Sequence, residues 1–113
     1  MIDKKYIINL QGKDFVLYAG LLNEFHENGG KSIKTEIINT DPLIIQATVE
    51  GENGLFQGIG DADDENTNKM VAKHKIRMAE TRAIARALRW YNNVDMCSLD
   101  ELGGDKLTNN SPF

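Results

Sequence analysis

A stretch of 26 residues without glycine or proline constrains the fold of this 113-residue chain more than any other feature. The stretch runs from residue 67 to about residue 92 and contains five alanines, the best helix formers. The segment before it, residues 61–66, is rich in Asp, Glu and Asn, which stabilise the N-terminus of a helix. The sequence therefore predicts one long helix over residues 67–92.

The earlier part of the chain contains strand patterns and one short helical pattern. Residues 6–10 and 15–18 are rich in β-formers and flank a Gln-Gly-Lys turn, which predicts a hairpin. Residues 19–28 carry leucine and phenylalanine at helical spacing and precede two glycines, which predicts a short helix. The order ββαβββα predicts an α+β fold, an antiparallel β-meander packed against one long C-terminal helix. The strands of the meander are predicted over residues 32–39, 43–50 and 55–59.

Length and composition indicate one domain and exclude several classes of protein. The chain has room for one compact domain, residues 1–102, and its polar end, residues 103–113, is expected to be a flexible tail. Cys97 is the only cysteine, so an internal disulfide and a cysteine-based zinc site are excluded, and we expect it to pack as a small hydrophobe. No apolar run approaches the roughly 20 residues that span a membrane. We therefore expect a cytoplasmic protein without membrane contact.

Positive charge is concentrated on the long predicted helix. The formal net charge is −4, yet residues 67–94 hold seven basic residues and one acidic residue, against six basic and sixteen acidic residues elsewhere. Four of the cations share one stripe of the helix, about 21 Å long, with no acid on it. Such a row suits the phosphates of a single nucleic-acid strand, and the neighbouring Trp90 can stack on a base. The stripe consists of Lys75, Arg82, Arg86 and Arg89, and Lys69, Lys73 and Arg77 are secondary contacts.

Two other interpretations of the stripe are open. Basic residues near a helix C-terminus are favoured by the helix dipole, and they can pair with acids from the rest of the chain. They can also bind acids of a neighbouring subunit in an oligomeric scaffold protein that binds no nucleic acid. Trp90 and the adjacent Tyr91 can equally be core packing at the end of the helix.

The long helix is predicted to have two apolar faces. The broader one, expected to cover the sheet, contains Met70, Met78, Ile84, Ala85 and Leu88. Together the two faces offer more apolar surface than one sheet covers, so we expect a second partner, either the short helix or another subunit. If the partner is another subunit, the protein is a homo-oligomer. The second, mostly small-residue face consists of Ala72, Ile76, Ala79, Ala83, Ala87 and Trp90.

The acidic cluster at residues 61–66 raises the question of a metal site. Paired carboxylates suit magnesium-dependent nuclease chemistry, but the cluster lacks the glycine and glutamate of a calcium loop. His26 and His74 have no catalytic partner at a recognisable spacing, and the Gly-Ile-Gly run at residues 58–60 is too short to bind a nucleotide phosphate. We expect no catalytic residue, no metal and no cofactor. The weaker alternative is a nuclease that uses Asp61, Asp63 and Asp64.

The junction of the last strand and the long helix resembles the core of single-strand annealing proteins. Residues 58–61 read Gly-Ile-Gly-Asp, and residues 79–88 read Ala-Glu-Thr-Arg-Ala-Ile-Ala-Arg-Ala-Leu. This recombination and DNA-repair superfamily includes the Rad-type annealing mediator of eukaryotes and the Sak, Erf and DdrA proteins of phages and bacteria. The resemblance covers residues 32–92 and implies single-stranded DNA binding between sheet and helix, and assembly into rings or filaments. We therefore predict a non-enzymatic, oligomeric single-stranded DNA-binding protein.

Overall fold

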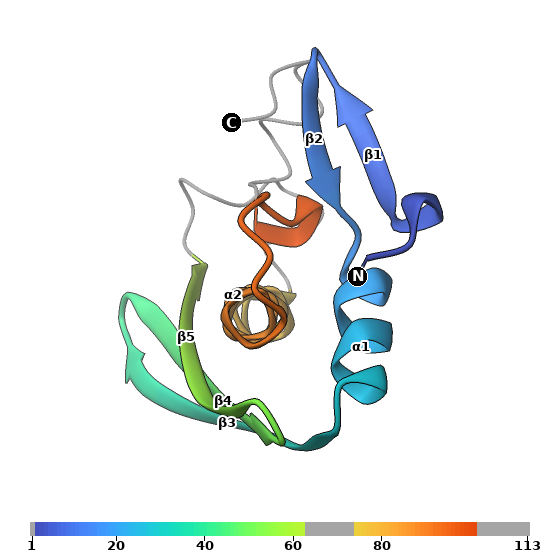
Figure 1. Ribbon diagram of the computed structural model, residues 1–113. Coiled ribbons are helices and arrows are strands. Elements are labelled where there is room, and N and C mark those ends of the chain that lie inside the picture. Colours follow the sequence, from blue (N-terminus) through green and yellow to red (C-terminus); the bar gives the residue numbers. More distant parts are fainter. Residues whose placement is uncertain (1, 63–73, 102–113) are drawn as a thin grey trace.

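The computed structural model describes residues 2–62 and 74–101 (Figure 1). Its main elements follow the predicted ββαβββα order, and the predicted α+β class is confirmed. The hairpin β1–β2 precedes α1, and a three-stranded antiparallel sheet of order β3-β4-β5 packs against α2. The elements are β1 Ile7–Leu10, β2 Lys13–Val16, α1 Tyr18–Glu27, β3 Gly30–Thr40, β4 Leu43–Gly51, β5 Gly54–Ala62 and α2 Lys75–Asn92, with 3₁₀ turns at Lys4–Tyr6 and Leu99–Glu101.

Local sequence explains where these elements begin and end. Gly12 has a φ of 83° in the turn between β1 and β2, and Gly29 has a φ of 76° between α1 and β3. Both values lie in the left-handed region, which glycine adopts at little cost. Asn93 ends α2 in the same region, and its N–H bonds carbonyl groups of the last helical turn. The predicted C-terminus of the long helix is therefore correct, while residues 67–73 lie outside the described part.

The strand β5 is longer than predicted, and this changes the role of its glycines. It continues to Ala62, whereas the sequence predicted an end at Ile59. Gly58 and Gly60 therefore lie inside a strand. Both face α2, because a Cβ built on Gly60 would collide with the main chain at Ala79, and one on Gly58 would collide with the main chain of the next helical turn.

The two apolar faces of α2 are exchanged relative to the prediction. Ala79, Ala83 and Ala87 are fully buried at the level of the β5 glycines, because a helix this close to a strand has space only for small side chains. Ala85 and Leu88, which were expected to face the sheet, are fully buried on the opposite side. Figure 1 shows α2 end-on between the sheet and α1, which covers that side.

The alanine face therefore has its partner, the sheet, within the chain, and of the two further partners that the sequence left open for α2, the short helix is the one that packs against it. Sheet and short helix together cover both faces of α2. Ile76 and Trp90, at the two ends of that face, are instead exposed, by 59% and 68%. Met70 and Ala72 lie outside the described part of the chain.

Tyr91, near the end of α2, connects three segments. Its hydroxyl group donates a hydrogen bond to the carbonyl of Asn28 (2.8 Å) and accepts one from the main-chain N–H of Asn53 (3.2 Å). Its ring packs edge-on against Phe25 and Phe56, with centroid distances of 4.9 and 5.7 Å. The end of α1, the β4–β5 turn and α2 are therefore held together at one buried side chain.

We expect Tyr91→Phe to lower the free energy of unfolding by about 1 to 2 kcal/mol, because the ring stays packed while the Asn28 carbonyl and the Asn53 N–H lose their part-buried hydrogen bonds. Urea denaturation followed by circular dichroism measures this. Tyr6→Phe, the same chemical change on the half-buried N-terminal turn, is the control and should have a smaller effect. Equal effects in the two variants would contradict the role assigned to the Tyr91 hydroxyl.

Candidate nucleic-acid interface

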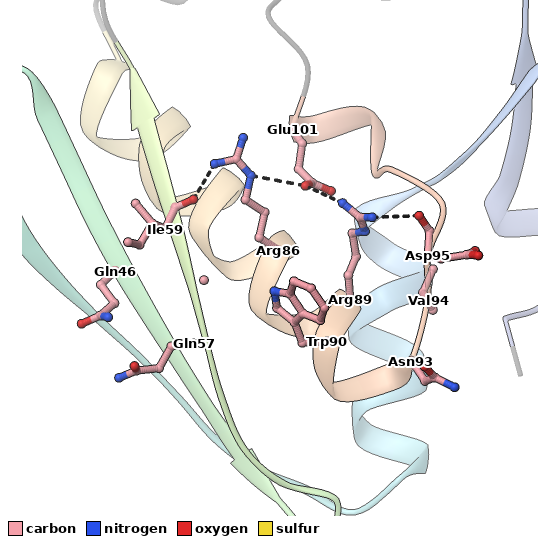
Figure 2. A pocket seen from close by; sticks show the side chains of 11 residues that line it. Gln46, Gln57, Ile59, Arg86, Arg89, Trp90, Asn93, Val94, Asp95 and Glu101 are labelled. Carbon is pink, nitrogen blue, oxygen red and sulfur yellow. Dashed lines mark hydrogen bonds and ion pairs between the residues drawn. The ribbon is translucent and has the colours of Figure 1, made fainter.

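An open cavity of about 680 Å³ lies between β5 and the C-terminal half of α2. The strand β5 is an edge strand of the sheet, and the lining extends to Gln46 of the neighbouring strand β4. Figure 2 shows the strand on one side, the helix on the other, and the segment that follows α2 beside them. The lining includes Gln57 and Ile59 from β5, Arg86, Arg89 and Trp90 from α2, and Glu101.

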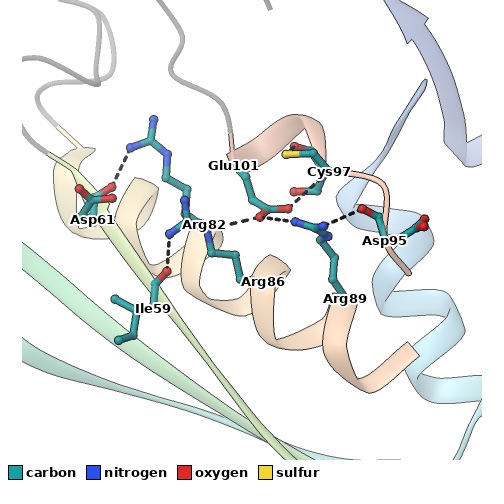
Figure 3. Close-up of polar contacts among 9 residues, drawn as sticks. Ile59, Asp61, Arg82, Arg86, Arg89, Asp95, Cys97 and Glu101 are labelled. Carbon is teal, nitrogen blue, oxygen red and sulfur yellow. Dashed lines mark hydrogen bonds and ion pairs between the residues drawn. The ribbon is translucent and has the colours of Figure 1, made fainter. Parts of the chain in front are cut away.

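Two arginines of α2 hydrogen-bond carbonyl groups along β5 (Figure 3). Arg82 Nη1 donates to the carbonyl of Asp61 at 2.7 Å, and Arg86 Nη1 donates to that of Ile59 at 2.6 Å. Four helical residues rise about 6.0 Å and two strand residues rise about 6.6 Å, so the spacing of the arginines matches that of the carbonyls. The same match brings Ala83 close to both strand glycines. The helix and the strand therefore run antiparallel, and every four residues of α2 match two residues of β5.

Trp90 occupies the next position of this repeat. It lies four residues after Arg86, where a third arginine would reach the strand near Gln57. An indole ring has no guanidinium group, so Trp90 cannot hydrogen-bond a strand carbonyl in the way that Arg82 and Arg86 do. The side chain is instead 68% exposed and lines the cavity (Figure 2). The cavity therefore opens where the arginine repeat ends.

Glu101 borders the cavity from the 3₁₀ turn after α2. Its Oε1 accepts hydrogen bonds from Arg86 Nε at 3.3 Å and Arg89 Nη1 at 2.9 Å, and its Oε2 accepts one from the main-chain N–H of Ser98 at 2.8 Å. Arg89 also donates through Nη2 to the carbonyl of Asp95 at 2.9 Å. Two cations of the predicted stripe thus pair with an acid from elsewhere in the chain, which is one of the interpretations that the sequence left open.

Two groups next to Glu101 have raised pKa values. Burial raises the pKa of the Cys97 thiol, the charge of Glu101 raises it further, and nearby cations, Arg89 first, lower it. The thiol is therefore protonated at neutral pH and is not an activated nucleophile. Burial also raises the pKa of Asp100, while a hydrogen bond from the main-chain N–H of Tyr18 lowers it.

Three of the predicted nucleic-acid contacts come together in the cavity: Arg86, Arg89 and Trp90. Arg82 does not join them. It is only 2% exposed, and the expectation that it lies on an exposed stripe is wrong. The reason is the close packing of α2 on β5, which encloses the base of this side chain beside Gly60.

The other four predicted cations lie away from the cavity or outside the described residues. Lys75 and Arg77 belong to the first turn of α2, and neither lines the cavity. Lys69 and Lys73 fall in the undescribed range. The stripe is therefore not one continuous track within the part of α2 that the structure describes.

Sequence reasoning missed the polar residues that the strands and the last turn add to the cavity. Gln46 of β4 pairs with Ile59, and Thr48 pairs with Gln57, so both glutamines project from the same face of the sheet. Strand alternation could have found them. Glu101 has no such signal, because a short 3₁₀ turn far from the arginines in sequence brings it there.

The structure also bears on the metal site, the helix cap and the membrane contact that were considered from the sequence. Within residues 2–62 and 74–101, no group of three or more His, Cys, Asp or Glu side chains is placed to hold a metal ion. Asp61 belongs to β5 and is not part of a helix cap, and residues 63–66 of the acidic cluster lie outside the described ranges. None of the described helices is long and apolar enough to cross a membrane.

Comparison of the chain with protein-family models, with curated proteins and with solved structures yields no match.

Proposed function

We propose that this protein binds single-stranded DNA in the cavity between β5 and α2. The observation that carries the proposal is the meeting of two arginines, Arg86 and Arg89, with an exposed tryptophan in one open cavity. Arginine binds phosphate through charge-assisted hydrogen bonds, and an exposed indole ring offers a surface on which an unpaired base stacks. Gln46 and Gln57 also line the cavity, from the face of the sheet turned away from α2, and their amides add donors and acceptors for base edges. A single strand presents both a phosphate and a free base, the two components that these residues can bind.

The resemblance of residues 58–61 and 76–89 to annealing proteins supports a role in recombination or DNA repair in the cytoplasm. Under this proposal the protein is not an enzyme, and it binds a strand without changing it. Assembly into an oligomer is part of the resemblance. It now needs a surface other than the alanine face, since Ala79, Ala83 and Ala87 are buried within the chain.

The scaffold alternative is less well supported than strand binding. It requires the arginines of α2 to find their acids on a neighbouring subunit. Arg86 and Arg89 already contact Glu101 of their own chain, so they do not call for an external carboxylate.

The single tryptophan of the chain makes the proposal directly testable. An oligothymidylate of about 20 nucleotides, longer than one site, should quench the fluorescence of Trp90 on binding. In anisotropy measurements with a labelled strand, Trp90→Leu should weaken binding about tenfold or more, because one stacked base contributes about 1–3 kcal/mol. Trp90→Tyr should retain most of the affinity, since a tyrosine ring still stacks.

Duplex DNA of the same length is the specificity control for this experiment. Its bases are already stacked on one another, so it should compete poorly for the cavity. Quenching by duplex and single strand alike, or no response to the single strand in fluorescence or anisotropy, would contradict the proposed function.

A further inference from the structure

The carboxylate of Glu101 is held by a set of donors that is typical of a phosphate site. Arg86 and Arg89 approach one oxygen, and the main-chain N–H of Ser98 approaches the other. Only 4% of the glutamate side chain is exposed, whereas the two arginine side chains are 38% and 25% exposed. The two arginines thus face both the carboxylate and the open cavity, and an anion entering the cavity meets them there, whereas Ser98 is fully buried and does not line the cavity.

The same place contains hydrogen-bond donors that Glu101 leaves unused. Ser98 Oγ and Arg89 Nε are both buried, and within the described part of the chain neither has a hydrogen-bond partner. Buried donors without partners are rare in native proteins, because each carries a desolvation cost. A tetrahedral phosphate offers more acceptor oxygens than a planar carboxylate does, so it can engage donors that the glutamate does not.

The main chain around Glu101 is anchored independently of its side chain. Val16 N–H donates to the carbonyl of Cys97 at 3.1 Å, and Arg89 holds the carbonyl of Asp95. The carboxyl group of Asp100 accepts a hydrogen bond from the N–H of Tyr18 at the start of α1. The Glu101 side chain can therefore rotate away while the Ser98 N–H stays in position.

We propose that Glu101 occupies a phosphate subsite and that a backbone phosphate of the bound strand displaces it. This inference rests on the proposed function and adds a regulatory contact to it. Two anions cannot share the same donors, so strand binding must first release the carboxylate. Glu101 then competes with the phosphate for the arginines and lowers the affinity of the protein for the strand. Only a ligand that binds the arginines more strongly than the carboxylate does can displace it.

The test compares Glu101→Gln with Glu27→Gln. Both variants remove one negative charge, but Glu27 is an exposed residue at the end of α1, which packs on the side of α2 away from the sheet, and it does not line the cavity. Glutamine keeps the size of the side chain and one acceptor oxygen, and thermal unfolding verifies that both variants are folded. Glu101→Gln should bind oligothymidylate about tenfold more tightly than the unchanged protein, because the phosphate no longer competes with a charged carboxylate for the arginines. Glu27→Gln should change affinity less than about twofold, because its exposed carboxylate is not part of the cavity lining and is screened by solvent and salt.

Inorganic pyrophosphate separates failure of this inference from failure of the proposed function. In amide NMR spectra, pyrophosphate should shift the Ser98 N–H signal of the Glu101→Gln variant at lower concentration than in the unchanged protein. If this occurs while neither protein binds the oligonucleotide, the phosphate subsite stands and the proposed function is wrong. If the strand binds with equal affinity to both proteins and Ser98 does not respond, the proposed function stands and the competition by Glu101 is wrong.

Discussion

Replacing Arg86 and Arg89 together by alanine should weaken binding of oligothymidylate about a hundredfold, because each charge-assisted hydrogen bond to phosphate contributes about 1.5 kcal/mol or more. The plot of log affinity against log salt concentration should also become less steep, by about 0.7 for each phosphate that the protein no longer neutralises. Both values come from anisotropy titrations over a range of salt concentrations. The comparison is made in the Glu101→Gln background, since the nearly buried carboxylate would otherwise lose both of its arginine partners.

The matched control is the double variant Lys75→Ala with Arg77→Ala in the same background. It removes the same charge from the same helix, but from the first turn of α2, outside the cavity lining. A strand bound in the cavity predicts a much smaller loss of affinity for this pair. Equal losses of affinity in the two double variants would instead favour binding along the whole helix and would contradict the assignment of the site to the cavity.

Gly60→Ala should lower the free energy of unfolding by about 3 kcal/mol or more, the upper part of the range for overpacked interiors. The added methyl group would collide with the main chain of α2 at Ala79 and Ala83, and helix backbone cannot move aside as the end of a flexible side chain can. The helix must then leave the strand, which separates Arg82 and Arg86 from the carbonyls that they hold. Chemical denaturation measures the stability, and the Trp90 emission maximum reports the local change.

Gly12→Ala serves as the control for this substitution. A Cβ at Gly12 would meet no atom within 4 Å, although the positive φ of 83° is strained for alanine. We expect a cost of about 1 kcal/mol there, from the backbone alone. A Gly60 variant as stable as the Gly12 variant would show that α2 does not depend on close approach to β5.

The number and order of the elements could be predicted because alternation, turn residues and an uninterrupted helical stretch are local signals. Which face of α2 packs against the sheet could not be predicted. Hydrophobicity favoured the side with Leu88 as the sheet contact, since larger apolar side chains bury more area. The deciding residues lie in another element: Gly58 and Gly60 remove the side chains that would otherwise separate strand and helix, so the alanine side fits.

The candidate site was predictable to the same extent. Arg86, Arg89 and Trp90 were identified because charge and aromatic residues near a helix end are visible in sequence. The burial of Arg82 was not visible, because it depends on how closely α2 approaches β5. Glu101 was missed because the turn at Leu99–Glu101 reaches the arginines only after the chain has folded back along α2.

The hydrogen bonds from Arg82 and Arg86 to β5 have a further consequence for association between molecules. An exposed strand edge offers carbonyl groups to any other strand, and this is a common route to aggregation and to sheet extension. At Asp61 and Ile59 those carbonyl groups already accept from guanidinium groups, so a foreign strand finds its acceptors occupied. The other edge of the sheet is β3, where residues 35–40 are exposed. Growth of the sheet by strand pairing is therefore directed away from the candidate cavity beside β5, and any assembly of this kind would leave the cavity open.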